Sequence, residues 1–161
     1  MWSTEPPMSN RAETLQRVIA ESQRHYAAYT LFNQAMADRL GLHPTDLQCV
    51  ALLELEPGPV SSGAVARLTG LTPGSATRLV DRLEKAGLVV RRPDPDDRRR
   101  ALVALVPEAR TRISDAWEVP GTAFGEVLAR YDDAELELIA DYLRRASEVG
   151  RAQAERLTAR E

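Results

Sequence analysis

The chain has 161 residues, of which 43% are hydrophobic and 28% charged, so it is long enough to bury one sizeable core. Ala, Leu, Val, Arg and Glu dominate over aromatic residues, which favours helices and makes an all-β sandwich a poor fit. No stretch approaches the roughly 20 apolar residues that a membrane crossing needs, so we expect no membrane role. The single cysteine, Cys49, and an N-terminus without signal-peptide features predict a cytoplasmic protein.

The net charge of −3 argues weakly against nucleic acid as a partner, but the charge is unevenly distributed. Residues 71–110 carry nine basic and six acidic side chains, so this window has a charge of +3 and the rest of the chain −6. The excess of basic charge is therefore concentrated in one quarter of the chain.

Two long amphipathic helices are predicted at the ends of the chain. Apolar residues at spacings of three and four predict a helix over 11–40, which Gly41 ends. Asp132 and Glu135 have the spacing of a capping box at the start of a helix that runs towards Leu157. A small core cannot cover such long apolar stripes, so a second copy of the chain is the predicted partner.

Three shorter helices are predicted between the terminal ones. The first spans Pro44 to Leu55 and ends before Pro57, and a short second one begins at Ser61-Ser62 and ends at Gly70. The third spans 72–86 and opens on Thr72-Pro73. Two helices joined by a tight glycine-containing turn have the pattern of a helix-turn-helix. In the first helix the side chains expected to point inward are Leu47, Val50, Ala51 and Leu55.

The region after Gly87 predicts a β-hairpin followed by a helix. Leu88–Val90 and Ala101–Leu105 are short β-prone runs on either side of a polar loop over 91–100. This pattern indicates a wing, a hairpin with a long tip. Pro107 then begins a helix to about Tyr131, in which Pro120-Gly121 predicts a kink or a break.

Two surfaces in this region have the chemistry of a DNA contact. The 72–86 helix has Ala76, Leu79, Val80 and Leu83 on one face, which turns small polar residues and the arginines Arg78 and Arg82 outward, as reading of a major groove requires. The alternative is an ordinary solvated helix face. At the wing tip, three consecutive arginines can enter a minor groove, and Asp97 is expected to pair with one of them and fix its orientation.

The run from Leu71 to Arg110 resembles the MarR family of winged helix-turn-helix transcriptional regulators. Its specific part is Thr77-Arg78-Leu79-Val80-Asp81-Arg82-Leu83-Glu84-Lys85-x-Gly87-Leu88-Val89, followed by Asp97-x-Arg99. The resemblance extends more loosely over the whole chain, including the long first helix and the final helix pair that dimerises in that family. It implies that Thr72 to Lys85 is the recognition helix, that Arg99 is the minor-groove arginine and that Asp97 orients it.

The fold expected from this resemblance is mainly α with a small β-wing, in a single chain over 1–161. A winged helix-turn-helix lobe over 44–106 lies between dimerisation helices over 11–40 and 107–161. The resemblance implies a homodimeric repressor that binds a pseudo-palindromic operator in double-stranded DNA through recognition helix 72–86 and wing 89–105. The expected DNA contacts are Thr72, Ser75, Thr77, Arg78, Arg82, Asp97, Arg98, Arg99 and Arg100.

The chain departs from the family after the second wing strand. Where the family usually has Leu-Thr-Pro-x-Gly, this sequence has Leu105-Val106-Pro107-Glu108-Ala109. Val106 therefore offers no hydroxyl to cap the helix that follows.

The resemblance also implies a small aromatic or phenolic effector, which family members bind in a crevice between the dimer helices and the winged lobe. The residues that best fit such a role are Tyr26, Tyr29, His43 and Trp117. The alternative is that these aromatic side chains belong to the core or to the dimer interface.

Other functions fit the sequence poorly. Gly58 to Gly63 has the glycine interval of a P-loop but lacks the following Lys and Ser or Thr, and the acids from Asp94 lack the glycine and glutamate of a calcium loop. With one cysteine and two histidines we expect no metal, no cofactor and no enzyme activity. Cys49 is predicted to be a buried apolar residue, and the alternative, implied by the resemblance, is a thiol that senses oxidants. The two rival interpretations are a winged-helix module that binds a protein instead of DNA, and a small enzyme of unfamiliar type.

Overall fold

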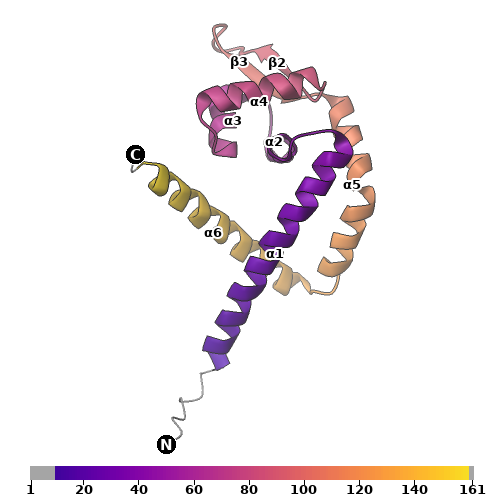
Figure 1. Cartoon of the computed structure of the whole chain (residues 1–161), viewed down its shortest axis with the longest axis vertical. Helices are drawn as coiled ribbons and strands as arrows, with labels where there is room; N and C mark the ends of the chain where they lie inside the picture. Colours follow the sequence, from indigo (N-terminus) through magenta and orange to yellow (C-terminus); the bar gives the residue numbers. More distant parts are fainter. Residues whose placement is uncertain (1–9, 160–161) are drawn as a thin grey trace, which may run out of the picture. The chain divides into compact units, whose positions relative to one another are not determined.

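The computed structural model describes residues 10–159, which are mainly helical with a small antiparallel sheet (Figure 1). Two compact parts divide the chain, residues 1–48 and residues 49–161. The expected absence of a signal peptide concerns the N-terminus, of which residues 1–9 lie outside the described residues. None of the described helices combines the length and apolar character that a membrane crossing requires.

The first part contains α1 (Asn10–Leu40) and the beginning of α2 (Pro44–Leu55), as the apolar spacing predicts. Gly41 ends α1 with a φ of +68°, a left-handed conformation that glycine adopts without steric cost. Leu42 N donates to Ala37 O at 2.9 Å and Gly41 N donates to Asp38 O at 3.1 Å. This pair of hydrogen bonds is a Schellman motif, so the predicted left-handed cap is confirmed.

The second part contains the predicted helix-turn-helix, made of α3 (Ser62–Thr69) and α4 (Pro73–Lys85). Ser61 Oγ accepts a hydrogen bond from Ala64 N at 3.2 Å, and Thr72 Oγ1 accepts one from Ser75 N at 3.3 Å. Each hydroxyl satisfies a backbone donor that the first helical turn leaves unpaired. Between the helices Gly70 has a φ of +69°, which allows the tight turn.

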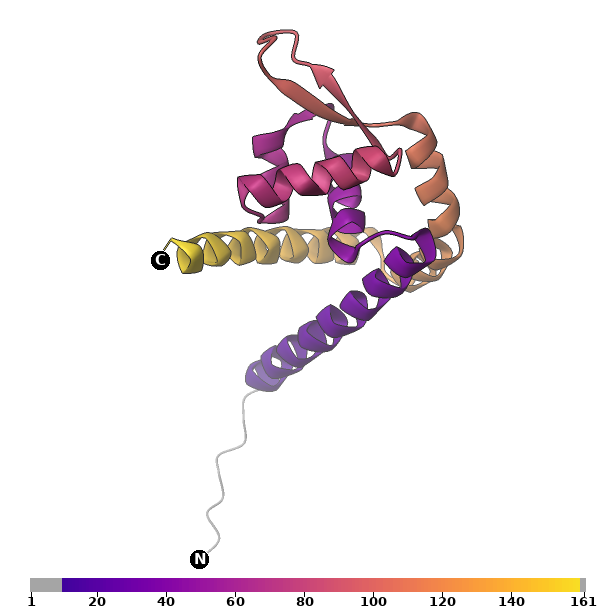
Figure 2. The same ribbon diagram turned by 45° about the horizontal axis from the view of Figure 1, so that its top comes forward.

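Three strands form an antiparallel sheet in the order β1-β3-β2: β1 (Val60–Ser61), β2 (Val89–Pro93) and β3 (Ala101–Leu105). The predicted hairpin is β2–β3, in which Val89 pairs with Leu105, and its loop extends beyond α3 and α4 in both views (Figures 1 and 2). Strand β1 was not predicted. It has only two residues, and one of them, Ser61, is also the cap of α3.

The core of the second part is centred on α4. Its buried residues include Cys49, Val50, Leu53, Val65, Ala76, Leu79, Val80, Leu83, Leu88, Val89, Val103 and Ala109. The burial expected for Leu47 and Val50 is confirmed, but the burial expected for Ala51 and Leu55 is wrong, since both are exposed. At about 100° per residue, Ala51 and Leu55 lie roughly 100° and 140° around the helix from Val50, away from its buried face.

Two further helices complete the second part, α5 (Pro107–Leu128) and α6 (Asp133–Thr158). Helix α5 continues through Pro120-Gly121, so no break occurs there. The capping box of α6 is confirmed: Asp132 Oδ1 accepts from Glu135 N, and Glu135 Oε2 accepts from Asp132 N, both at 2.9 Å. None of the described residues of α6 is buried.

Gly70→Ala and Gly74→Ala are expected to change stability in opposite directions. A Cβ at either position would meet nothing within 4 Å, so the backbone alone decides the effect. Alanine is strained at the positive φ of Gly70 and should cost roughly 1 kcal/mol, whereas in α4 it should stabilise by about 0.5 kcal/mol by restricting the unfolded chain. Urea unfolding of the full chain measures both changes, and shifts of the same sign would contradict this account.

Candidate nucleic-acid interface

The orientation of α4 is set by its apolar face. Ala76, Leu79, Val80 and Leu83 are at most 1% exposed, which fixes the opposite face towards solvent. The five predicted DNA-contacting residues of this helix region, Thr72, Ser75, Thr77, Arg78 and Arg82, are exposed except for Ser75, which is half-buried. The structure brings Ser75, Arg78 and Arg82 onto one side of the helix, within about 60° of one another, whereas Thr77 lies roughly 100° from Arg78.

Hydrogen bonds order the first turns of α4. Thr72 Oγ1 donates to Ser75 Oγ at 3.0 Å, and the Arg78 guanidinium donates to the same Ser75 oxygen at 3.4 Å. Thr77 Oγ1 donates to Pro73 O at 3.0 Å. The polar groups at the N-terminal end of the helix therefore hold one another in place, which lowers the entropy lost when such a face meets a ligand.

The wing tip is a loop whose backbone is held by its own acidic residues. Asp94 N donates to Arg100 O at 3.0 Å and Arg100 N donates to Asp97 O at 2.8 Å. Asp94 Oδ1 also accepts a hydrogen bond from Asp96 N at 2.9 Å. The acidic residues beside the three arginines thus stabilise the conformation of the loop.

Arg99 projects from this loop with 96% of its side chain exposed. Asp97 Oδ1 accepts a hydrogen bond from the Arg99 backbone amide at 3.0 Å and lies 3.9 Å from Arg99 Nε. The stronger of these contacts fixes the backbone of Arg99, and the longer one leaves its guanidinium free to turn towards another anion. Arg98 and Arg100 are exposed beside it.

Arg91 connects the wing to α4, a role that sequence reasoning missed. Its guanidinium forms an ion pair with Asp81 at 2.6 Å and another with Glu84, and its backbone amide donates to Glu84 Oε1 at 3.2 Å. Burial alone lowers the pKa of Arg91, but the hydrogen bonds and charges of Asp81 and Glu84 outweigh it and raise that pKa above its usual value. The arginine is therefore a permanent cation between helix and strand.

The Arg91 contact was missed because the end of strand β2 was predicted too early. The sequence predicts that the loop begins at Arg91, whereas β2 continues to Pro93. Within a strand, successive side chains point to opposite faces of the sheet. Arg91 and Arg92 therefore face opposite ways, and Arg91 is on the face that meets α4.

The missing cap at Val106 is replaced by backbone contacts. Val106 makes no side-chain capping hydrogen bond, but its carbonyl accepts from Ala109 N at 3.1 Å and Pro107 occupies the first helical turn. Val106 N donates to Leu88 O at 3.1 Å. The start of α5 is thus attached to the base of the hairpin without a hydroxyl.

The four candidate effector residues differ in how far they are exposed to solvent. Tyr26 and Tyr29 on α1 are 76% and 44% exposed, and the Tyr29 ring centroid is 6.1 Å from that of His25. His43 is exposed just before α2, where its Nδ1 accepts from Thr45 N at 3.4 Å. Trp117 on α5 is half-buried, with its ring centroid 6.3 Å from that of Phe124.

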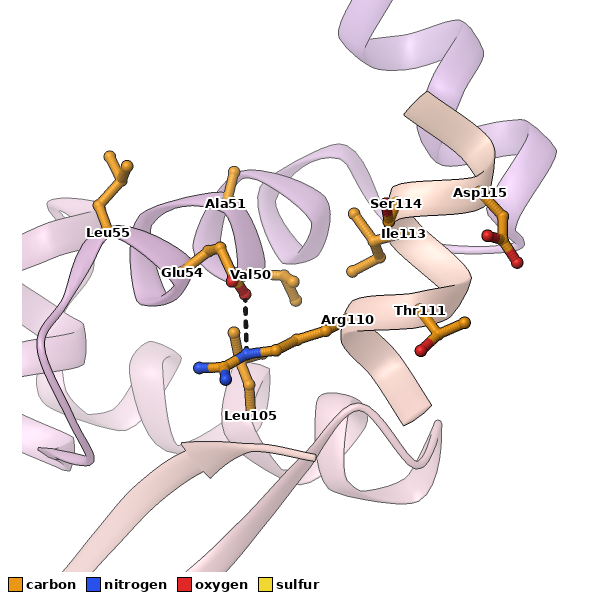
Figure 3. Close-up of a pocket in the computed structure, with 10 residues that line it drawn as sticks. All are labelled: Val50, Ala51, Glu54, Leu55, Leu105, Arg110, Thr111, Ile113, Ser114 and Asp115. Atoms are coloured by element: carbon orange, nitrogen blue, oxygen red, sulfur yellow. Dashed lines mark hydrogen bonds and ion pairs between the residues drawn. The ribbon is translucent and has the colours of Figure 1, made fainter. Parts of the chain in front are cut away.

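A pocket of about 620 Å³ lies between α2, α5 and the end of β3 (Figure 3). None of the four candidate effector residues lines it. Arg110 extends from α5 towards α2, where its Nε donates to Glu54 Oε2 at 3.2 Å. The exposed Ala51 and Leu55, which were expected to point into the core, line this pocket instead. The sequence contains no motif that marks it.

The remaining candidates for chemistry have structural positions. Cys49 is a free cysteine that is 1% exposed, as predicted. Across residues 10–159, no three His, Cys, Asp or Glu side chains are grouped so that they could hold a metal ion.

Comparison with known proteins gives consistent matches. Residues 40–100 match the sequence model of the MarR family. The chain is 38% identical over 149 residues to YcgE of Bacillus subtilis, an uncharacterised HTH-type transcriptional regulator, covering 92% of this chain and 96% of YcgE. Among solved structures, CouR from Rhodococcus jostii RHA1, bound to p-coumaroyl-CoA, has a TM-score of 0.60 and 30% identity over 76% of this chain and 85% of CouR. A MarR family protein from Bacillus stearothermophilus, 22% identical, shares the fold with a TM-score of 0.66, covering 88% of this chain and 96% of its own.

The ion pairs of Arg91 are expected to make a modest, salt-dependent contribution to stability. Arg91→Gln and Glu84→Gln, made singly and together, should give a coupling free energy of roughly 0.5–1 kcal/mol, because the carboxylates are partly exposed. Urea unfolding at low salt and at about 1 M NaCl should show the coupling decrease as salt screens the charges. Arg98→Gln combined with Glu84→Gln is the control without coupling. An Arg91–Glu84 coupling free energy that is zero, or that does not change with salt concentration, would contradict the ion-pair assignment.

Proposed function

Because the chain belongs to the MarR family of transcriptional regulators, whose DNA-binding element is a winged helix, we propose that it is a homodimeric repressor of operator DNA. In this proposal α4 with its cap, residues 72–86, is the recognition helix, and residues 89–105 form the wing. The lobe over 44–106 binds DNA, and the helices over 11–40 and 107–161 join the two copies.

The observation that carries the proposal is the joint exposure of α4 and the wing tip. The buried face of α4 leaves Arg78 and Arg82 accessible, and Arg99 extends from the wing with almost its entire side chain in solvent. Arginines of this kind bond guanine edges in a major groove and enter narrow minor grooves. The proposed contacts are Thr72, Ser75, Thr77, Arg78, Arg82, Asp97, Arg98, Arg99 and Arg100.

Exposed apolar side chains support a dimer. On α1, Ile19 and Leu31 are 59% and 74% exposed, and on α6 Leu138 and Val149 are 71% and 60% exposed. We infer that these exposed apolar side chains of the two helices meet the second copy of the chain. A two-fold dimer would place two recognition helices about 34 Å apart, in successive major grooves, and the operator would be a pseudo-palindrome.

Relief by a small aromatic or phenolic ligand is the regulatory part of the proposal. CouR, which is similar to this chain, is bound to p-coumaroyl-CoA, which supports an aromatic effector. The pocket between α2 and α5 has a volume typical of ligand sites and is our preferred location, ahead of Tyr26, Tyr29, His43 and Trp117. A ligand would release DNA only to the extent that it binds better to the DNA-incompetent dimer.

The rival interpretation is a winged-helix module that binds protein. Affinity for double-stranded DNA distinguishes the two, because each neutralised phosphate releases counterions and makes binding fall steeply with salt. Selection of genomic DNA fragments on the purified full chain would recover the operator. If no fragment is enriched at any salt concentration, the DNA proposal fails and the protein-binding module is favoured.

Arg99→Ala is expected to weaken operator binding without loss of thermal stability. A minor-groove arginine should contribute roughly 5- to 100-fold in affinity, and its loss should flatten the salt dependence. Fluorescence anisotropy with the recovered operator measures both effects. Arg130→Ala removes the same charge from an exposed position after α5 and should bind like wild type. Equal affinity in the two variants would remove the wing tip from the proposed interface.

The full chain is expected to be a dimer in sedimentation equilibrium, through the apolar face of its terminal helices. Leu143→Glu combined with Val149→Glu should weaken association by at least about tenfold, because each places a charge in an apolar contact. Glu137→Gln, a change at a charged position of α6, is the control. A monomeric wild-type chain, or a double variant that associates normally, would refute this dimer.

A further inference from the structure

Two carboxylates stand beside the proposed DNA-contacting face of α4. On a helix with about 100° per residue, Asp81 lies roughly 60° from Arg78, and Glu84 lies a further 60° in the same direction. The side chains of Asp81 and Glu84 are 59% and 41% exposed. Negative charge at this place repels DNA phosphates, so the two acids oppose the binding that the proposed function requires unless a cation compensates them.

Arg91 of β2 supplies that cation and attaches the wing to α4 at the same time. Each terminal nitrogen of its guanidinium contacts one carboxylate: Nη2 is 2.6 Å from Asp81 Oδ1, and Nη1 pairs with Glu84 Oε2. The second oxygen of Glu84 accepts a hydrogen bond from the Arg91 backbone amide at 3.2 Å. These contacts hold both the side chain and the backbone of one strand residue against the helix.

The contact of Arg91 with α4 lies where the buried base of the wing ends. Along β2, Val89 is 2% exposed, Arg91 is half-buried and Arg92 is exposed. Arg91 pairs in register with Val103 of β3, which is 1% exposed. Beyond this point the hairpin loop extends past α3 and α4 (Figures 1 and 2). A small rotation of the strand at Arg91 therefore becomes a larger displacement of Arg99 at the tip.

We propose that Arg91 is a positioning residue for DNA binding, which holds the wing where Arg99 reaches the minor groove while α4 lies in the major groove. The inference rests on the proposed function, because Arg99 adds affinity only in a chain that binds DNA. Arg91 itself contacts no base and acts through Arg99 and through the neutralised Asp81 and Glu84. Its loss has two effects: the wing tip loses its fixed position, and two uncompensated acids face the phosphates.

A double-mutant cycle on operator affinity, measured by fluorescence anisotropy of the full chain, tests the positioning role. Arg91→Gln should weaken binding, and in its background Arg99→Ala should cost at most about twofold, because a wing that is no longer fixed does not deliver that arginine. Arg92→Gln removes the same charge from the neighbouring residue, which faces the other side of the sheet, and should leave the cost of Arg99→Ala at its wild-type value. An equal cost of Arg99→Ala in wild type and in Arg91→Gln overturns the proposal, as does a negligible cost in wild type.

Asp81→Ala combined with Glu84→Ala separates position from charge. Alanine offers Arg91 no acceptor and suits a helix, while the variant loses two negative charges beside the DNA. If charge alone mattered, operator affinity would rise and Arg99→Ala would cost as much as in wild type. The positioning role predicts that binding to non-operator DNA strengthens, whereas the cost of Arg99→Ala falls to about twofold, as in Arg91→Gln. A wild-type cost of Arg99→Ala in this variant contradicts the positioning role.

Hydrogen exchange without DNA separates this inference from the proposed function. In the full chain, the amides of residues 89–105 should exchange at least about fivefold faster in Arg91→Gln than in wild type, because the wing opens more often without its attachment. Arg92→Gln should exchange like wild type. If Arg91→Gln and Arg92→Gln exchange alike while the operator is bound, only the positioning role fails. If exchange is faster in Arg91→Gln but no operator is recovered, the proposed function fails, and the role of Arg91 in DNA binding fails with it.

Discussion

Burial of one face of α4 is the constraint on which the rest of the lobe depends. Ala76, Leu79, Val80 and Leu83 are almost completely inaccessible, and each large apolar side chain buried in this way contributes roughly 1.5–3 kcal/mol. Rotation of the helix about its axis would expose them, so the helix has one favourable orientation. The same burial that stabilises the lobe therefore determines which side chains are available to DNA.

The wing is positioned by a different kind of interaction. Its strands are attached to the lobe at Val89 and Val103, which are buried, and at Arg91, which is held by two carboxylates of α4. Ion pairs at partly exposed positions are weak and respond to salt and to neighbouring charges. A helix held by burial and a wing held in part by salt-sensitive ion pairs thus occupy the same lobe.

Periodicity and capping chemistry predicted most of the fold. The bounds of α2 agree with the prediction, and those of α1, α3 and α4 agree to within a residue or two, because their caps Ser61, Thr72, Gly41 and Gly70 act locally. Strand β1 was missed because a two-residue strand is defined by its partner β3, which is distant in the sequence. The continuous α5 shows that one Pro-Gly step does not end a helix with enough turns on either side. The exposed face of α4 was predicted together with its buried face, because both follow from the spacing of the apolar residues. The Arg91 contacts and the pocket at Arg110, in contrast, depend on tertiary packing that no local pattern encodes.

The position of β2 at the margin of the sheet has a consequence for solubility. Across residues 10–159 this strand pairs on one side only, with β3, and a strand with unpaired amides and carbonyls invites another chain to add to the sheet. Arg91, Arg92 and Pro93 occupy this margin: the Arg91 amide already donates to Glu84, the charge of Arg92 repels a second copy of the same strand, and the proline offers no amide to pair. Residues that attach the wing to α4 thereby also disfavour edge-to-edge association of the sheet with a second copy.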